Sequence, residues 1–493
     1  MLRPLHVTLG ERISSEKDVP LYGQVIRAII RDIRSGRLAA GKYLPSSRQL
    51  AAQLGVNRKT VVIAYEELIA QGWLRSAGTR GTIVSPAFPA HTGKPPSAEP
   101  IHTDMPSIGE VAPYYRVLPP PERPIALPGG QGLKLDEGAP DGRLFPAETL
   151  ARAYRKAIVG AAAENRLQYR DPLGSMRLRC AIAEMLRNQR ALSITPEEVC
   201  ITRGSQNALF LATQILLKPG ETVLVEALTH EPAMAAFRSA GAHVVAVPLD
   251  GSGIDVEGVE AACRRHRVRA VFLTPHHQFP TTVALRPERR LRMLDLARQF
   301  GFAVLEDDYD HEFHFASQPL LPMAAYSPEH VIYLGSLSKL LLPTLRIGYI
   351  VGPRAIMPAL AHAISVTDGM GNRLTEDAAA DLIVSGELQR HAYKVRKIYA
   401  ERRRQFADKL RARFSDTVAF DPPDGGLAFW LRFPGIDLDA AEARAWAAGL
   451  RLASSRSFMA SEDAPRGLRV GFASLNATEA QYAVDALHRA TYV

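Results

Sequence analysis

The residues best suited to chemistry surround Lys339. The run 335–349 places this lysine beside Ser336 and Ser338, and Arg346 follows seven positions later. A lysine amine can form an imine with an aldehyde, and hydroxyl and guanidinium groups can bind a phosphate. This combination predicts a Schiff base between Lys339 and a phosphorylated aldehyde cofactor.

An acidic segment, residues 306–310, offers a partner for such a cofactor, since it ends a predicted strand. A carboxylate beside the pyridine nitrogen of pyridoxal phosphate keeps that nitrogen protonated, so that the ring can accept electrons. Asp307 and Tyr309 share a face if the strand continues. We assign Asp307 to the ring nitrogen and Tyr309 to the ring hydroxyl, and we expect Asp308 to point away. An acidic strand end in solvent is the alternative, and the pairing with Lys339 argues against it.

A second phosphate-binding element is predicted where Gly204, Ser205 and Gln206 join a strand to a helix. The unpaired N–H groups and the dipole at a helix start favour an anion. Many capped helices share this pattern, so the turn does not identify a phosphate site by itself. Combined with the serines and the arginine around Lys339, it predicts a phosphate cup.

From about residue 131 the sequence alternates between short apolar strands and helical stretches such as Gln206–Leu217 and Arg289–Phe300. This alternation predicts an α/β domain with a largely parallel sheet. The candidate strands are Val199–Thr202, Thr222–Glu226, His243–Val247, Ala270–Thr274, Phe302–Glu306, Val331–Leu334 and Ile347–Val351.

Residues 16–84 are patterned differently. A helical stretch follows Pro20 and ends near Gly36; its apolar face holds Val25, Ile26, Ile29, Ile30 and Ile33. Ser46 and Gln49 then form a predicted capping box, and Gly55 ends that second helix. A third helix begins after Asn57 and stops at Gly72, with Val61, Ala64 and Leu68 as its buried stripe. Two helices joined by a tight glycine turn predict a helix-turn-helix.

Arg58, Lys59 and Thr60 begin the third helix, whose first residues commonly meet base edges or phosphates in such motifs. Leu74–Ser76 and Thr82–Ser85 form a predicted two-stranded wing. An ordinary three-helix module with surface arginines has the same pattern, so shape alone does not decide for DNA.

Charge and proline content divide the chain. The net charge is +9, and residues 1–90 hold 13 Lys+Arg against 6 Asp+Glu, or +7. Such a basic segment attracts phosphate backbones, although a solvated basic face is the alternative. Residues 85–130 contain twelve prolines, which predicts a stiff spacer.

Composition narrows the class of protein. A hydrophobic content of 46% and a charged content of 23% are typical of a globular protein, and no apolar run is long enough to span a bilayer. The three cysteines, Cys180, Cys200 and Cys263, lie far apart and predict neither a disulfide framework nor a zinc site. We therefore expect a cytoplasmic protein with no metal site and no membrane partner.

The N-terminal motifs resemble the GntR-type winged helix-turn-helix. The resemblance covers about residues 17–85 and rests on the segments 20–24, 44–54, 57–61 and 64–68. It implies a domain that binds a double-stranded DNA operator. The residues that it places at the DNA interface are Arg48, Arg58, Lys59 and Thr60.

The remainder resembles the fold-type I aminotransferases, and the whole chain resembles the MocR subfamily of GntR regulators. Further matching motifs are 138–146, 169–174 and 467–472. The implied architecture is multidomain: an α+β winged helix-turn-helix at 17–85, a Pro-rich linker at 86–130, and an α/β pyridoxal-phosphate-binding domain for effector binding and dimerisation at 131–493.

The resemblance also implies roles for single residues. Lys339 would hold pyridoxal 5'-phosphate as the internal aldimine, and Arg469 would bind the carboxylate or similar anion of an effector. The chain would form a homodimer in which the region of Tyr169 reaches the cofactor of the neighbouring subunit. From the residues alone, Arg469 would instead be a surface ion pair.

Three positions depart from the family pattern. His230 stands where an aromatic often stacks on the cofactor ring, Thr282 where glycine is usual, and Phe279 near the place of an asparagine that binds the ring hydroxyl. These departures predict at most residual transaminase activity. His277 and Gln278 either line the pocket or pack in the core.

Together these features predict a pyridoxal-phosphate-dependent transcriptional regulator that senses a small amino compound by aldimine exchange at Lys339. Two alternatives stay open. The first is a working aminotransferase with a secondary DNA-binding module, and the second is a regulator that senses pyridoxal phosphate itself.

Overall fold

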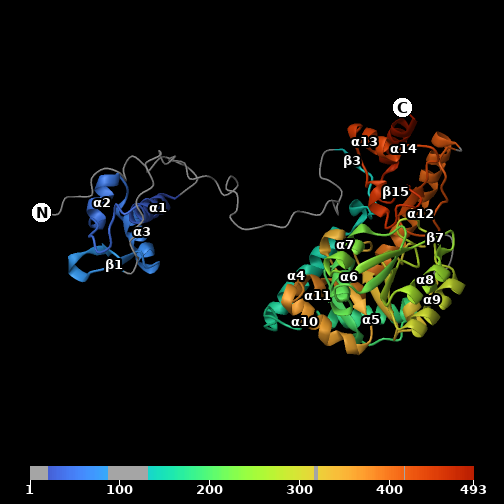
Figure 1. The fold of residues 1–493 in the computed structure, drawn as a ribbon, viewed down its shortest axis with the longest axis horizontal. Helices are drawn as coiled ribbons and strands as arrows, with labels where there is room; N and C mark the ends of the chain where they lie inside the picture. The colour runs from blue at the N-terminus through green and yellow to red at the C-terminus, as the bar shows by residue number, and fades with distance from the viewer. Residues whose placement is uncertain (1–19, 87–131, 316–319, 416, 493) are drawn as a thin grey trace. The chain divides into compact units, whose positions relative to one another are not determined.

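The computed structural model describes residues 20–86, 132–315, 320–415 and 417–492. Along the sequence they fall into two compact units, residues 20–86 and residues 132–492 (Figure 1). Most of the predicted linker, residues 87–130, lies outside the described residues, as do 17–19, 131 and 493. None of the described helices is both long and apolar enough to cross a membrane.

The N-terminal unit is the predicted winged helix-turn-helix. Ser46 and Gln49 form the capping box at the start of α2, and Gly55 ends that helix in the left-handed conformation at φ 65°. The side chain of Asn57 caps α3 by accepting a hydrogen bond from the backbone N–H of Lys59. The elements are α1 Leu21–Arg34, α2 Ser47–Leu54, α3 Arg58–Ala70, β1 Leu74–Ser76 and β2 Thr82–Val84.

A small core holds these helices together. Val25 and Ile29 of α1 meet Val61, Ala64 and Leu68 of α3, and all five side chains are fully buried. Strands β1 and β2 pair antiparallel and form the predicted wing. The apolar stripe of α3 faces inward, whereas Arg58 and Lys59 at the N-terminal end of this helix are exposed.

The larger unit is built on a seven-stranded sheet with the order β4-β12-β11-β10-β9-β5-β6. Strand β12 is antiparallel to both of its neighbours, and the other pairs are parallel. The prediction of a largely parallel sheet is confirmed. The strands are β4 Val199–Thr202, β5 Thr222–Glu226, β6 His243–Val247, β9 Val268–Leu273, β10 Ala303–Asp308, β11 Val331–Ser336 and β12 Gly348–Val351.

Helices cover both faces of this sheet (Figure 1). Side chains of one strand therefore alternate between two cores: in β5, Val223 and Val225 join one apolar cluster and Leu224 joins the other. Burial on both faces explains why the strands are almost continuously apolar. The helices are α4 Ala147–Ala163, α5 Met176–Arg190, α6 Ser205–Leu216, α7 Glu231–Ser239, α8 Val256–Arg265, α9 Pro287–Phe300, α10 Met357–Thr367 and α11 Arg373–Val384.

The C-terminal residues form a smaller layer beside the sheet. Strands β13 (Ala428–Leu431) and β15 (Leu468–Gly471) pair antiparallel, and β14 (Leu450–Arg451) pairs parallel with β3 (Leu133–Lys134). This pairing brings the start of the unit to its end. The short pair β7 Leu249–Asp250 and β8 Gly253–Ile254 and the helices α12 Glu387–Phe414, α13 Leu438–Ala447 and α14 Ala477–Tyr492 complete the unit.

Candidate functional site

Lys339 lies just after β11, in the loop that leads to β12. Its Nζ donates a hydrogen bond to the backbone carbonyl of Gly138 at 2.6 Å. Burial lowers the pKa of this amine below its ordinary value, and the positive charge of Arg469 lowers it further, against the opposing effect of Asp136. A lysine with a lowered pKa is more often neutral, and only the neutral amine is a nucleophile.

Arg469, in β15, lies in the same part of the molecule and is 2% exposed. Its guanidinium donates to the carbonyls of Glu137 at 2.9 Å and Pro280 at 2.7 Å, and to the hydroxyl of Tyr309 at 3.2 Å. Among the described residues it forms no ion pair, and it lies over the ring of Phe279 at 4.5 Å. It is therefore not the surface ion pair that the residues alone suggested, but a buried cation held by neutral acceptors.

Asp307 and Asp308 differ in their surroundings although both end β10. Asp307 Oδ1 is buried and has no hydrogen-bond partner in the described structure. Burial raises the pKa of Asp307 to about 8, and the charges of Asp308 and Asp310 act in the same direction. Asp308 instead accepts a hydrogen bond from the hydroxyl of Tyr333, so it does point elsewhere.

Tyr309 follows β10 and links two parts of the site. Its hydroxyl donates to the carbonyl of His277 at 2.9 Å while it accepts from Arg469. Burial raises the pKa of this phenol above its ordinary value, so it stays protonated.

His230 precedes α7 and meets the ring of Phe279 edge-on, with 4.9 Å between the ring centroids. Burial lowers the pKa of His230 to about 4, and the positive charges of Lys339 and Arg469 contribute. The ring is therefore neutral near pH 7.

Two segments predicted to contribute to a phosphate cup meet where α6 begins. A Cβ on Gly204, whose φ is +82°, would stand 3.2 Å from Arg346 Cζ, so the guanidinium lies directly against this turn. A Cβ on Gly348 would stand 2.9 Å from the backbone nitrogen of Ser205. Glycine at both positions lets strand β12 approach the start of the helix.

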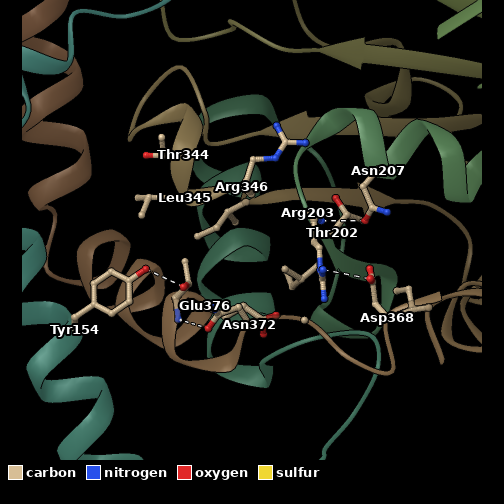
Figure 2. A pocket seen from close by; sticks show the side chains of 15 residues that line it. Tyr154, Thr202, Arg203, Asn207, Thr344, Leu345, Arg346, Asp368, Asn372 and Glu376 are labelled. Carbon is tan, nitrogen blue, oxygen red and sulfur yellow. Dashed lines mark hydrogen bonds and ion pairs between the residues drawn. The ribbon is translucent and has the colours of Figure 1, made fainter. Parts of the chain in front are cut away.

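The other predicted phosphate ligands lie around the same turn. Ser336 Oγ accepts a hydrogen bond from the backbone N–H of Ser338 at 3.1 Å, and Gln206 donates to the carbonyl of Pro232 at 2.8 Å. Figure 2 shows Arg346 at one edge of a pocket of about 450 Å³, directed toward α6, whereas Arg203 turns to Asp368. Lys339, Asp307 and Tyr309 do not line that pocket.

These residues fit pyridoxal phosphate. Asp307 Oδ1 is buried and has no hydrogen-bond partner among the described residues, and a pyridinium nitrogen would satisfy it. Arg346 and the first N–H groups of α6 are donors of the kind that hold a phosphate. Lys339 is an amine of lowered pKa, as an imine-forming lysine needs to be.

The sequence did not reveal that backbone carbonyls position both cations of this site. Gly138 begins a segment that was singled out only as a motif, Glu137 stands just before that segment, and no side-chain pattern marks a carbonyl as an acceptor. The amide of Gln278 donates to the carbonyls of Leu228 and Phe279 and accepts from the backbone N–H of Thr281. Gln278 is 1% exposed, so it is part of the core. His277 pairs with Asp310 at 2.7 Å.

Two other positions are set apart from this cluster. Tyr169 is 89% exposed, so this chain by itself does not bring it to the site. Thr282 adopts φ 65°, a left-handed conformation that suits glycine and strains a β-branched residue.

The four predicted DNA-contacting residues lie on two neighbouring helix starts. Arg48 in α2 and Arg58 and Lys59 in α3 are exposed, and Thr60 is half-buried. Arg58 Nε donates to Ser47 Oγ at 3.5 Å, which joins the two helix starts. Three exposed basic side chains therefore stand at these two helix starts, as a DNA-binding surface needs.

Comparison with known proteins agrees with both units. Residues 21–84 match the family of bacterial regulatory proteins of the gntR type, and residues 131–487 match aminotransferase class I and II. The chain is 31% identical over 422 residues to the probable rhizopine catabolism regulatory protein MocR of Rhizobium meliloti, covering 85% of this chain and 83% of that protein. It is 29% identical over 410 residues to the pyridoxine biosynthesis regulator PdxR of Corynebacterium glutamicum, covering 83% and 82%.

A solved structure agrees with the fold of the larger unit. LysN, an α-aminoadipate aminotransferase of Thermus thermophilus in complex with N-(5'-phosphopyridoxyl)-L-leucine, superposes with a TM-score of 0.68. It is 30% identical and covers 73% of this chain and 92% of that chain. A gntR-type domain and an aminotransferase domain in one chain, with MocR as a relative over most of its length, place this protein in the MocR subfamily of GntR-type transcriptional regulators.

Proposed function

We propose that this protein is a pyridoxal-phosphate-dependent transcriptional regulator that senses a small compound with both an amine and an anionic group. The effector amine would compete with Lys339 for the cofactor, and Arg469 would bind the anion. The domains would be the DNA-binding unit at 17–85, the linker at 86–130 and the effector-binding unit at 131–493.

One observation supports this proposal above the others. Lys339 and Arg469 donate hydrogen bonds to neighbouring backbone carbonyls, those of Gly138 and Glu137. An amine and a buried guanidinium that forms no ion pair within the described residues are therefore held by consecutive residues of one segment. A ligand that replaces the amine and pairs with the guanidinium would satisfy both groups at once.

The bound cofactor would supply an aldehyde that condenses with a primary amine. The chain's own residues would do the rest. Asp307 would hold a proton on the ring nitrogen, Tyr309 would bind the ring hydroxyl, and His230 would stack as a neutral ring. Ser205, Gln206, Ser336, Ser338 and Arg346 would bind the phosphate.

Regulation requires that the effector prefer one conformation of the protein over another, since binding alone shifts no equilibrium. An effector amine that replaces Lys339 on the cofactor would free Lys339 to donate to the carbonyl of Gly138, and the anion of the effector would draw on Arg469. Both changes act on the segment that follows β3. In a homodimer, the exposed Tyr169 would reach the neighbouring subunit, and paired winged helices would contact the operator.

The first test is spectroscopic. Purified protein given pyridoxal phosphate should turn yellow, and borohydride should fix the cofactor on Lys339. Lys339→Ala should abolish this covalent capture, whereas Lys218→Ala, which removes an exposed lysine, should leave it intact. Cofactor trapped on the Lys339→Ala protein would show that another lysine holds it.

Similarity to an aminotransferase supports a second candidate function, that of an active aminotransferase. The regulator would be supported if an amino acid displaces the Lys339 amine from the cofactor without further reaction and changes the affinity of the protein for DNA. Steady turnover of an amino acid with a keto acid would support the aminotransferase. A DNA affinity that responds to pyridoxal phosphate with no amine added would instead make the cofactor itself the signal.

A further inference from the structure

A group of histidines lies beside the proposed cofactor site but has no part in it. His276 follows β9, and His311 and His314 follow β10, at the edge of the sheet where Asp308 ends its strand. The His276 and His311 rings meet edge-on with 4.8 Å between their centroids, and those of His311 and His314 with 5.2 Å.

Two of these histidines, His276 and His311, converge with Asp308 on one point. His276, Asp308 and His311 each direct one ligand atom inward, and the three atoms lie within 4.8 Å of one another. His276 Nδ1 stands 3.4 Å from Asp308 Oδ1, and His311 Nδ1 stands 2.9 Å from Asp308 Oδ2. Ligands bound at about 2.0–2.1 Å to a tetrahedral metal stand a little over 3 Å apart, so this spacing suits such an ion.

The converging atoms make no hydrogen bond of good geometry within the described residues, although His311 Nδ1 stands at ion-pair distance from Asp308 Oδ2. His276 Nδ1, His311 Nδ1 and Asp308 Oδ1 are buried without a hydrogen-bond partner of acceptable geometry in the described structure. The three residues are 5%, 6% and 2% exposed. Unpaired polar atoms at such burial are costly, so a group that binds all three would stabilise the fold.

The hydrogen bond that His276 makes determines which of its ring nitrogens carries the hydrogen. Its Nε2 lies 2.5 Å from the backbone carbonyl of Leu320. A carbonyl only accepts, so Nε2 carries the hydrogen, and in the neutral ring Nδ1 then bears a lone pair. That lone pair faces the oxygen of Asp308, and two electron-rich atoms repel unless a cation stands between them. A histidine that donates one ring N–H to a carbonyl while its other nitrogen is free has the arrangement of a metal ligand.

The surrounding charges also favour a cation. Arg190 Nε lies 4.0 Å from Asp308 Oδ2, but the guanidinium of Arg190 pairs with Glu312 at 2.5 Å. Arg290 points its three nitrogens at the carbonyls of Leu285, Leu321 and Pro275. Four carboxyl groups lie nearby, against these two arginines. The four are Glu306, Asp308, Asp310 and Glu312.

We infer that His276, Asp308 and His311 form a binding site for a divalent transition metal ion of the zinc class. Two imidazoles and one carboxylate are ligands that Zn²⁺ accepts, and three protein ligands leave a fourth position for water or for His314. His314 Nε2 is itself buried without a partner. Clefts of about 790 and 970 Å³ reach the group: His276 and His314 line the first, and His311 and His314 the second.

The test uses the full chain, freed of metal by a chelator and free of unbound pyridoxal phosphate. Titration with Zn²⁺ alone should give one tight site per chain. The variants His276→Gln and His311→Gln should each weaken that site by at least about a hundredfold, more than the roughly 10–100-fold that loss of an outer partner of a ligand costs. His362→Gln, which changes an exposed histidine of α10, should bind as the unaltered protein does.

A second measurement covers variants that fail to fold. Co²⁺ in place of zinc should give the strong visible bands of a four-coordinate ion in the unaltered protein. The weak bands of six-oxygen coordination would overturn the proposal, as would no binding at all. Folded variants should still capture pyridoxal phosphate, and a zinc affinity that neither histidine substitution changes would place the ion elsewhere and refute this site.

Discussion

Lys339 and Arg469 are 130 positions apart in sequence, yet their hydrogen bonds end on adjacent carbonyls, those of Gly138 and Glu137. The segment that begins after β3 thus holds an amine and a buried cation at a fixed spacing. Under the proposed function, we expect an effector whose amine and anion lie close together.

Replacing Arg469 with lysine should separate binding of the effector anion from capture of the cofactor. Lysine keeps the charge but cannot form the two parallel hydrogen bonds of a guanidinium. Loss of a charged hydrogen bond costs about 1.5–3 kcal/mol, which is about tenfold to a hundredfold in affinity for an amino acid. The visible spectrum during titration measures this affinity. A plain amine with no anionic group is the control, and a loss of its affinity as well would contradict the assigned role.

The pH dependence of stability should report Lys339 in the cofactor-free protein. Its pKa is lowered in the folded state, so between that pKa and the unfolded value the unfolded chain binds more protons. Stability should therefore rise with pH through this window. Lys339→Met removes the titrating amine and should be the more stable protein below the lowered pKa, with a difference that shrinks as the pH rises toward 10.5, the ordinary pKa of a lysine. Chemical denaturation of both proteins measures it, and a difference that does not change with pH would contradict the lowered pKa.

Arg58→Ala should weaken operator binding by about tenfold or more without changing cofactor capture. Arg58 is exposed at the start of α3, so its loss removes a DNA contact and not a core contact. Affinity should also fall steeply with salt, and less steeply in the variant. Arg298→Ala, which changes an exposed arginine of α9, is the matched control for net charge. Equal losses in both variants would mean that only total charge matters.

Thr282→Gly should stabilise the fold. Thr282 has φ 65°, where a side chain with a branched Cβ is strained and glycine is not. The free energy of unfolding should rise by about 0.5–1 kcal/mol, because the strain that is released exceeds the additional backbone entropy that glycine loses on folding. Thermal or chemical unfolding measures it. Val283→Gly, one position later and without a left-handed φ, should destabilise, and the same sign in both variants would refute the explanation.

Local sequence determined much of the fold. Strands β4, β5 and β6 have the predicted limits, because each is a short apolar run bounded by turn residues. Strand β10 runs two residues further than predicted, to Asp308, because Asp307 and Asp308 still pair with β11 although they are charged. Pairing with a neighbouring strand is a tertiary interaction, so an apolar pattern does not show it.

The sequence by itself also determined the candidate chemistry. Lys339, its serines and Arg346 lie in one short run, and local spacing is enough to predict a lysine next to a phosphate site. The winged helix-turn-helix is equally local, since the capping box of Ser46 and the turn at Gly55 are read from consecutive residues.

Only the tertiary structure decided what depends on distant residues. Arg469 is buried, and its contact with the carbonyl of Glu137 joins segments more than 300 positions apart. The meeting of His276 with Asp308 and His311 depends on two parallel strands ending at the same edge of the sheet. Periodicity reports which face a residue occupies, but it does not report which other residues the fold brings to that face.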